Sequence, residues 1–327
     1  MIVRFFKSSN TSVYILLPLI ALSIWAFGFV FPSTLALNNN MPLYELISPS
    51  INKVHWISIV IAITIVIGEA FLLNYIVNEN EILTKQSFLP ALFYILFVSN
   101  NKDMLQLYPQ LFANLFLLFA INKLLNSYRK DKAYSQVFDA GLLVAISTLF
   151  YFPYVFLIPV LGVALVVFRP FIWREWIISI IGVLVPYFFV AVFYFWNDAL
   201  GALWYEKMQL YLLHAVPPIK FSQGFYFTMF IGWGIVLFSF SRLFGSVTSG
   251  SQKSKKGFVL LLWVFLLSIP AAIFTTQLST RSFSVMAIPV AVFCSNYFLN
   301  IKKQWVDEIL FTLLYFSIII NLIAQAF

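Results

Sequence analysis

Two histidines, one cysteine and twelve acidic residues supply most of the groups in this chain that could do acid–base, nucleophilic or metal chemistry. Cys294 lies inside an apolar segment, where a thiol behaves as a small hydrophobic side chain. The sequence has no phosphate-binding loop, no dinucleotide fingerprint, no pair of CxxC motifs and no histidine-rich metal site. A divalent cation would be compatible with the chain, but no ligand set is predicted.

Glu45 is the first candidate catalytic residue. It lies in the segment LNNNMPLYELISPS, between two long apolar segments. The segment is half apolar, which favours docking on a membrane-embedded body over full solvation. A carboxylate held there could act as a general base on an acceptor hydroxyl. The alternative is a surface carboxylate near the start of a helix.

Glu69 is the second candidate, because it lies inside an apolar segment, IGEAFLLNYIV. A carboxylate within hydrocarbon costs roughly 2–3 kcal/mol on insertion scales, so it usually faces the protein interior with a partner. Glu69 is therefore either a proton-relay or ion site, or a hydrogen-bonded packing contact with Asn74 nearby. One isolated glutamate gives limited support for a transporter, whose spans usually contain more polar residues.

Arg281 and the two histidines are candidate substrate-binding residues. Arg281 lies in TTQLSTRSFSVMAIP, at the edge of a late apolar segment, and its guanidinium could bind a lipid phosphate bidentately. The alternative is a side chain that reaches the headgroups from the membrane edge. His55 and His214 are either substrate contacts or ordinary interfacial residues.

The composition predicts the elements that must hold these residues. Of the 327 residues, 62% are hydrophobic and 10% are charged, whereas soluble domains carry about 25% charged residues. The apolar residues form blocks that can cross a hydrocarbon core as helices. We predict an all-α, polytopic membrane protein with about eleven transmembrane helices, at 12–32, 55–77, 87–99, 108–126, 136–151, 153–168, 175–196, 224–242, 257–275, 283–299 and 306–325.

Proline and charge refine this prediction. Phe152-Pro153 interrupts the apolar stretch 136–168, which predicts a tight helical hairpin, since proline ends one helix and starts the next. The alternate loops hold fifteen and five of the 20 Lys and Arg residues. The positive-inside rule then predicts a cytoplasmic N-terminus and an extracytoplasmic C-terminus. Topology also explains the net charge of +8 without nucleic acid.

The charge count gives each loop a side. Glu45, His55, His214 and Arg281 fall on the outer side. The carboxylates on the cytoplasmic side lie beside Lys or Arg in the sequence, and we expect ordinary solvated loop charges there. This group consists of Glu79, Glu81, Asp131, Asp139, Glu175, Asp307 and Glu308.

Two loops suggest further organisation. The segment 245–257, rich in Gly, Ser and Lys, predicts a flexible cytoplasmic linker. It divides a single membrane domain, 1–327, into an eight-span body, 1–244, and a three-span C-terminal unit, 258–327. In the outer loop 197–223, apolar residues recur at helical spacing over 198–216, which predicts an amphipathic helix in the interface plane.

The layout resembles the C-type superfamily of membrane glycosyltransferases, which use polyprenyl-phosphate sugars on the extracytoplasmic side. Glu45 in the first outer loop, the hairpin 139–170 ending in Arg169, and Arg281 followed by Pro289 carry the resemblance. It implies that Glu45 activates the acceptor, that Arg281 binds the donor phosphate, and that 198–216 helps to form the donor groove. The chain departs from that pattern because Glu45 stands alone and a large C-terminal soluble domain is absent.

The chain also resembles uncharacterised bacterial multi-pass membrane proteins, and we expect it in the bacterial cytoplasmic membrane. Two other functions stay open. One is a non-enzymatic scaffold or accessory subunit of an envelope assembly, with a membrane-protein partner. The other is a transporter that uses Glu69. Membrane lipids are expected partners in every case, and nucleic acid is not.

Overall fold

The computed structural model describes most of the chain as helices. The described residues are 2–8, 11–31, 41–51, 54–202, 224–226, 228–230, 232, 234–239, 251–275, 279–301 and 303–325. Every regular element in these ranges is a helix, and they contain no strand. The predicted all-α class is confirmed.

Six helical segments in the described ranges are apolar and long enough to cross a membrane. They are α2 (Val13–Val30), α4 (His55–Glu79), α9 (Trp173–Trp196), α13 (Gln252–Ile273), the run Thr280–Asn300 that joins η4 (Thr280–Met286) to α14 (Ala287–Asn300), and α15 (Gln304–Ala324). Segments this long and apolar identify an integral membrane protein.

Shorter apolar helices complete the bundle. They are α5 (Leu89–Val98), α6 (Pro109–Leu125), α7 (Tyr134–Phe150), η2 (Phe152–Leu157) followed by α8 (Pro159–Phe168), and the described helical residues of 224–239. Each predicted span overlaps one of the long or short helical segments. The third, fifth and sixth predicted spans are among these shorter helices, and so are the fourth and the eighth.

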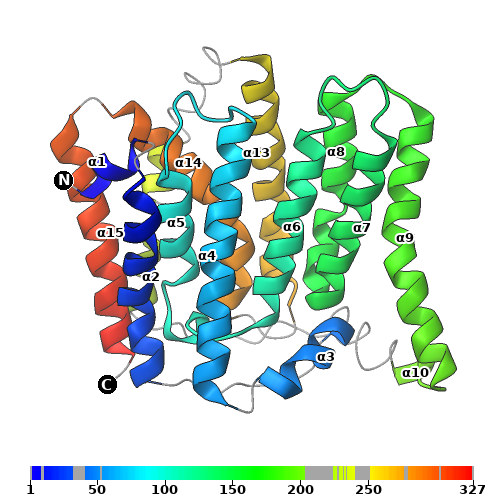
Figure 1. Cartoon of the computed structure of the whole chain (residues 1–327), viewed down its shortest axis with the longest axis horizontal. Coiled ribbons are helices and arrows are strands. Elements are labelled where there is room, and N and C mark those ends of the chain that lie inside the picture. Colours follow the sequence, from blue (N-terminus) through cyan, green and yellow to red (C-terminus); the bar gives the residue numbers. More distant parts are fainter. Residues whose placement is uncertain are drawn as a thin grey trace.

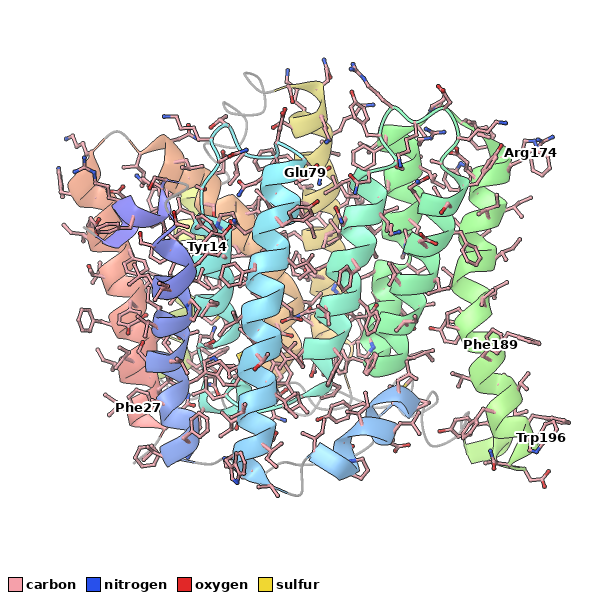
Figure 2. All side chains as sticks on the ribbon, in the orientation of Figure 1. Tyr14, Phe27, Glu79, Arg174, Phe189 and Trp196 are labelled. Carbon is pink, nitrogen blue, oxygen red and sulfur yellow. The ribbon has the colours of Figure 1, made fainter. Side chains whose placement is uncertain are left out.

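The helices run side by side between two ends of the bundle (Figure 1). Tyr14, Glu79 and Arg174 mark one end, and Phe27 and Trp196 mark the other (Figure 2). We call the first the basic end, because the loops richest in Lys and Arg lie there, and the second the distal end. Helix α1 (Ile2–Phe6) lies at the basic end, whereas α15 finishes at the distal end (Figure 1).

The helical hairpin turns at the predicted position. Helix α7 ends at Phe150, Tyr151 is extended, and η2 begins with Pro153 in its first turn. Helix α9 then packs closely on α7 through two glycines. A Cβ on Gly141 would lie 2.6 Å from the Ser179 carbonyl oxygen, and one on Gly182 would lie 2.5 Å from the Phe138 carbonyl oxygen. Small residues allow this close approach between membrane helices.

Helix α3 (Pro42–Ile51) lies obliquely across the distal end, below α6 and α7 and beside the end of α4 (Figure 1). Its Tyr44 is buried, and the Tyr44 hydroxyl donates to the carbonyl oxygen of Leu107 over 3.3 Å. The Tyr44 ring also faces Phe112, with 6.3 Å between the ring centroids. The expected docking of the segment around Glu45 on the membrane-embedded body is confirmed for α3.

The C-terminal helices share one hydrophobic core with the rest of the described chain. Lys7 pairs with Asp307, which joins α1 to the start of α15. At the distal end, Asn321 Nδ2 of α15 donates to the Asn100 carbonyl oxygen over 2.7 Å. Helix α13 begins at Gln252, with the Ser251 hydroxyl accepting from Ser254 N, so the end of the segment 245–257 is helical; residues 245–250 lie outside the described residues.

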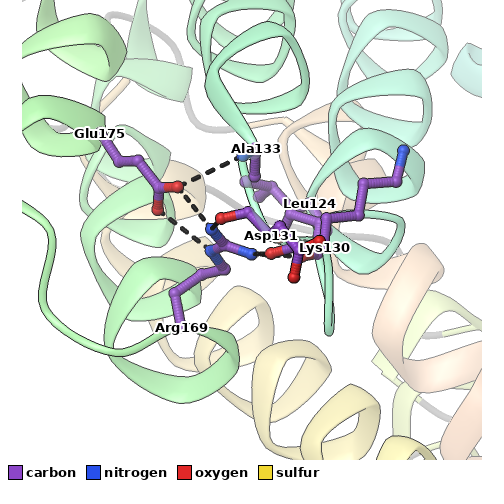
Figure 3. A network of polar contacts seen from close by, with 7 residues as sticks. Leu124, Lys130, Asp131, Ala133, Arg169 and Glu175 are labelled. Atoms are coloured by element: carbon purple, nitrogen blue, oxygen red, sulfur yellow. Dashed lines mark hydrogen bonds and ion pairs between the residues drawn. The ribbon is translucent and has the colours of Figure 1, made fainter.

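A buried ion pair closes the basic end of the hairpin (Figure 3). Arg169 donates to both carboxylate oxygens of Glu175, over 2.6 and 3.1 Å. The same guanidinium donates to the carbonyl oxygens of Ser127, Lys130 and Asp131. The network joins the α6–α7 loop to the end of α8 and the start of α9.

The expectation of solvated carboxylates on this side was wrong for Glu175 and Asp307. Their side chains are only 1% and 4% exposed, and each pairs with a basic side chain. The residues next to Asp307 in the sequence did not reveal its burial or its ion pair, because its partner Lys7 lies 300 residues away in the chain. Arg169, which the family resemblance associates with the hairpin, is fully engaged in holding the fold.

Candidate functional site

Glu69 lies deep in the bundle. It follows His55 by fourteen residues, or about 21 Å along the axis of α4, and its side chain is fully buried. Its Oε2 accepts a hydrogen bond of 2.9 Å from the hydroxyl of Tyr94 on α5. Glu69 has no ion-pair partner among the described residues. Its partner is therefore Tyr94, not Asn74 as the sequence suggested.

Hydrogen bonds extend from Tyr94 through three more helices. Asn114 Nδ2 on α6 donates to the Tyr94 hydroxyl and to the Ser284 carbonyl oxygen, each over 3.4 Å. Asn114 Oδ1 accepts from the Tyr154 hydroxyl over 2.6 Å. Side chains of α4, α5, α6 and η2 thus form one line, in which Tyr154 donates to Asn114, Asn114 to Tyr94, and Tyr94 to Glu69. We call these four residues the Glu69 network.

Two buried polar atoms near the network, Glu69 Oε1 and the Thr280 hydroxyl, have no hydrogen-bond partner among the described residues. A buried polar atom without a partner costs about 1–3 kcal/mol. Glu69 Oε1 is therefore available to water or to a polar ligand.

The polar groups continue from Glu69 to the distal end. Ser284 lies beside both Tyr154 and Tyr108. The guanidinium of Arg281, which is partly exposed, lies over the Tyr108 ring, 5.9 Å from its centroid. Arg281 Nε also donates to the Asp103 carbonyl oxygen over 2.8 Å. Arg281 therefore lies at the distal end of a group of polar side chains that reaches inward to Glu69.

A second set of polar side chains adds to this group. The hydroxyls of Tyr151 and Ser282 are 3.4 Å apart, and Gln110 and Thr275 lie beside Tyr151. These residues come from the distal ends of α6, α7, α13 and η4. These side chains carry hydroxyl and amide groups, and neutral groups of this kind can hydrogen-bond to water, cations or hydroxylated ligands.

Glu45 lies in the first turn of α3 and is partly exposed. Glu45 and Arg281 belong to elements that contact the same short segment, because Tyr44 bonds to Leu107 and Arg281 lies over Tyr108. The two elements thus share the distal end, while Glu69 lies deeper in the bundle. His55 begins α4, with Nε2 3.4 Å from the Gly28 carbonyl oxygen.

His214 and residues 203–216 of the predicted amphipathic helix lie outside the described residues. At the start of that segment, α10 (Leu200–Ala202) is helical. No group of three or more His, Cys, Asp or Glu residues in the described ranges could hold a metal ion.

Sequence reasoning missed Tyr94, Asn114, Tyr154 and Ser284. Asn114 carried a usable signal, since it is an amide inside the apolar segment 108–126. Tyr94 also lies in the middle of a predicted span, away from the interfaces where tyrosine is common. Tyr154 follows the predicted turn at Pro153 directly and carried no such signal. The convergence of these residues on Glu69 comes from helix packing, which the one-dimensional pattern does not contain.

Comparison with known proteins gives a family without an assigned activity. The model of a family of unknown function, DUF6427, matches residues 41–326. The chain belongs to the DUF6427 family. This membership covers α3 to α15 and therefore both the Glu69 network and the distal-end residues. No curated protein and no solved structure matches the chain.

The comparisons give no glycosyltransferase family for the chain, so the resemblance in layout is not supported at the family level. What is established for this DUF6427 protein is a helical, multi-pass integral membrane protein. Any activity must be argued from its own residues.

Proposed function

We propose that this protein is a transporter that binds a proton or a small cation at Glu69, reached from the extracytoplasmic side. In this proposal the chain crosses the bacterial cytoplasmic membrane about eleven times. The basic end faces the cytoplasm, in keeping with the positive-inside rule, and the end of α15 faces outward.

The observation that carries the proposal is the state of the Glu69 carboxyl. One oxygen accepts from Tyr94, and the other is buried without a hydrogen-bond partner among the described residues. A carboxylate here would lack a counter-charge among the described residues, and a proton on Oε1 would lack an acceptor among them. An ionisable group in a membrane interior is by default a functional candidate. In this proposal a cation pairs with the ionised Glu69 carboxylate, and a proton neutralises the carboxylate when the cation leaves.

The surrounding groups suit such an exchange. Tyr94 holds the carboxyl by a hydrogen bond, and Asn114 and Tyr154 extend the line of neutral side chains behind Tyr94. Neutral partners leave Glu69 free to bind a positive charge, whereas a fixed Lys or Arg would neutralise it permanently. The neighbouring hydroxyls of Ser284 and Tyr108 lie between this position and Arg281. They supply oxygen atoms along the route from the distal end.

Ion flux in liposomes tests the proposal. Purified protein is reconstituted with a pH-sensitive dye inside, and proton or Na⁺ gradients are imposed across the membrane. Wild type should dissipate at least one gradient, whereas Glu69→Gln should fall to the protein-free rate while eluting as a folded monodisperse species. Glu81→Gln, an exposed carboxylate of the α4–α5 loop, is the matched control. Equal flux in wild type and Glu69→Gln would refute the proposal.

A second candidate function is sugar transfer from a polyprenyl-phosphate donor at the distal end. It is favoured by α3, which carries Glu45 across that end, and by Arg281 at the same end. Glu45 would take the proton of the acceptor hydroxyl as the acceptor oxygen bonds to the sugar carbon. The bond from that carbon to the phosphate oxygen would break, and Arg281 would neutralise the leaving phosphate.

The two functions predict opposite patterns in a deletion strain. Ion transport requires Glu69 and tolerates Glu45→Gln, whereas sugar transfer requires Glu45 and Arg281 and tolerates Glu69→Gln. Complementation is scored for each membrane-inserted variant at equal protein level. Full complementation by Glu45→Gln and Arg281→Ala would remove the transfer candidate. Full complementation by all three variants would favour an accessory subunit, which should then co-purify with a membrane-protein partner.

A further inference from the structure

The cleft at the basic end has no role in the proposed transport or transfer. It lies between α2, α4 and the loop that leads to α5, and its volume is about 460 Å³. Its walls include Tyr14, Asn74, Glu79 and Ser87. Tyr14 and Glu79 mark this end of the bundle (Figure 2). The cleft is thus separated from Arg281 by the length of the helices.

Two buried acceptors line the cleft without hydrogen-bond partners among the described residues. Asn74 is 4% exposed, and its Oδ1 has no partner; Ser87 is 1% exposed, and its Oγ has none. Asn78 instead bonds to the backbone of Ser87, with its Nδ2 3.3 Å from the carbonyl oxygen and its Oδ1 3.4 Å from the nitrogen. This pairing fixes the loop against α4. Asn74 Oδ1 and Ser87 Oγ are thus left without a partner among the described residues, just beneath the wall of the cleft.

The charge of the residues that line the cleft indicates which kind of headgroup it can bind. Glu79 supplies a carboxylate at the rim, and none of the described lining residues is basic. Tyr14 adds an aromatic face, held by Phe71 at 5.5 Å and Phe88 at 5.0 Å between ring centroids. Carboxylate, amide oxygen, hydroxyl and aromatic face together suit a primary ammonium group, which has three N–H donors and a positive charge. A purely anionic headgroup would be repelled by Glu79.

The position of the cleft favours a lipid as the source of that ammonium. Tyr14 and Tyr75, which both line it, are 54% and 56% exposed on the outside of two membrane-crossing helices. Below Tyr14, α2 also exposes Ile15, Leu19 and Leu22. An acyl chain can lie along this apolar surface while the headgroup enters the cleft. Lys85 stands in the same loop and is exposed, where it can meet the lipid phosphate.

We propose that this cleft binds the headgroup of an ethanolamine phospholipid of the cytoplasmic leaflet. Its ammonium is held by Glu79, the Asn74 amide oxygen and the Ser87 hydroxyl, against the face of Tyr14. The bound lipid fixes α2 and the α4–α5 loop against α4, at the end of the bundle where the chain begins.

Lipid binding to the purified full chain tests this site. Phosphatidylethanolamine, phosphatidylcholine and phosphatidylglycerol with identical acyl chains are titrated into delipidated protein in detergent, and bound lipid is counted by native mass spectrometry. Phosphatidylethanolamine should bind most tightly. The choline lipid has no N–H donors, and the glycerol lipid has no positive charge, so equal binding of all three would overturn the proposal.

Variants locate the binding. Glu79→Gln is exposed and should fold, and it should weaken phosphatidylethanolamine about two- to fivefold, as expected for a partly solvated charge pair. Asn74→Leu should weaken it about tenfold by removing a buried acceptor. Glu81→Gln, an exposed carboxylate outside the cleft, should bind as wild type does. If Asn74→Leu does not fold, the Glu79→Gln variant alone tests the site. Unchanged phosphatidylethanolamine binding in Glu79→Gln would refute the proposed headgroup site.

Soluble phosphoethanolamine separates a lipid from a free solute. The lipid site predicts that millimolar phosphoethanolamine displaces little bound phosphatidylethanolamine, because the acyl chains along α2 contribute to affinity. Displacement by the solute at concentrations equal to those of the lipid would overturn the assignment to a membrane lipid.

Discussion

At the scale of single residues, charged groups in this protein fall into two kinds. Arg169 and Glu175 are buried and fully paired, with five hydrogen bonds from one guanidinium. Glu69 is buried without a counter-charge among the described residues, and one of its oxygens is unpartnered. The first arrangement stabilises a fold, and the second suits exchange with a ligand. Burial alone therefore does not distinguish a structural charge from a functional one. The distinction comes from whether all polar atoms of the charged group have hydrogen-bond or ion-pair partners.

Breaking the Arg169–Glu175 pair should destabilise the protein strongly. In Arg169→Met the carboxylate of Glu175 stays buried without its cation, a loss of about 3–5 kcal/mol for buried pairs. Lys123→Met is the control, because its pair with Asp139 is 44% and 35% exposed and should contribute about 1 kcal/mol or less. Apparent melting temperatures in detergent compare the two variants. A melting temperature of Arg169→Met equal to that of Lys123→Met would contradict the structural role.

Tyr94→Phe should lower stability, because it removes the donor to Glu69 Oε2 and the acceptor for Asn114 Nδ2. Leaving buried partners unsatisfied costs about 1–3 kcal/mol. Tyr75→Phe removes a hydroxyl from a side chain that is 56% exposed and serves as the control. Intrinsic-fluorescence melting measures both. If Tyr94→Phe melts with the wild type, the Tyr94 bond to Glu69 contributes nothing to the fold.

At the scale of elements, small residues and proline set the arrangement of the hairpin. Pro153 starts η2 directly after α7, and the glycines of α7 and α9 bring these two helices into contact. Helix α9 forms one edge of the bundle (Figure 1). Its other faces expose apolar residues such as Ile180, Leu184 and Phe188, as expected for a helix in contact with lipid.

Gly182→Ala should push α9 away from α7, because the added Cβ would lie 2.5 Å from the Phe138 carbonyl oxygen, a backbone atom. Gly68→Ala is the matched control, since a Cβ there meets nothing within 4 Å. Alanine also favours helix over glycine by about 1 kcal/mol. Melting temperature should fall for Gly182→Ala and stay equal or rise for Gly68→Ala. The opposite order would show that α7 and α9 do not depend on this contact.

At the scale of the whole molecule, the bundle is closed by its first and last helices. Lys7 pairs with Asp307 at the basic end, and the hydroxyls of Ser23 and Tyr315 are 2.9 Å apart further along α2 and α15. These contacts join residues nearly 300 positions apart. Separately, the two ends of the bundle differ in charge, because the loops richest in Lys and Arg lie at the basic end. This difference is the basis for the proposed orientation in the membrane.

Cysteine labelling tests that orientation. Asp103→Cys and Asp198→Cys lie at the distal end and should react with a membrane-impermeant maleimide in intact cells. Lys85→Cys and Asp131→Cys lie at the basic end and should react after permeabilisation alone. All four side chains are exposed, whereas the native Cys294 is buried and gives little background. Labelling of Lys85→Cys in intact cells would reverse the proposed orientation.

The sequence by itself determined the helical membrane class, the approximate ends of the helices and the hairpin turn at Pro153. These properties depend on local composition and on proline, so they can be read in one dimension. It also placed Glu69 inside an apolar helix and Glu45 in a docked loop. It could not tell that Glu175 and Asp307 are buried, because their chain neighbours are solvated and, for Asp307, the partner is remote.

Only the tertiary structure decided which groups meet. Tyr94, Asn114 and Tyr154 reach Glu69 because α5, α6 and η2 pack beside α4, and a sequence records no rotation of one helix about its axis relative to another. The same packing leaves Glu69 Oε1 without a hydrogen-bond partner among the described residues. An isolated glutamate in the sequence thus became the innermost member of a group of polar side chains, since helix packing and not chain order sets the distances between side chains.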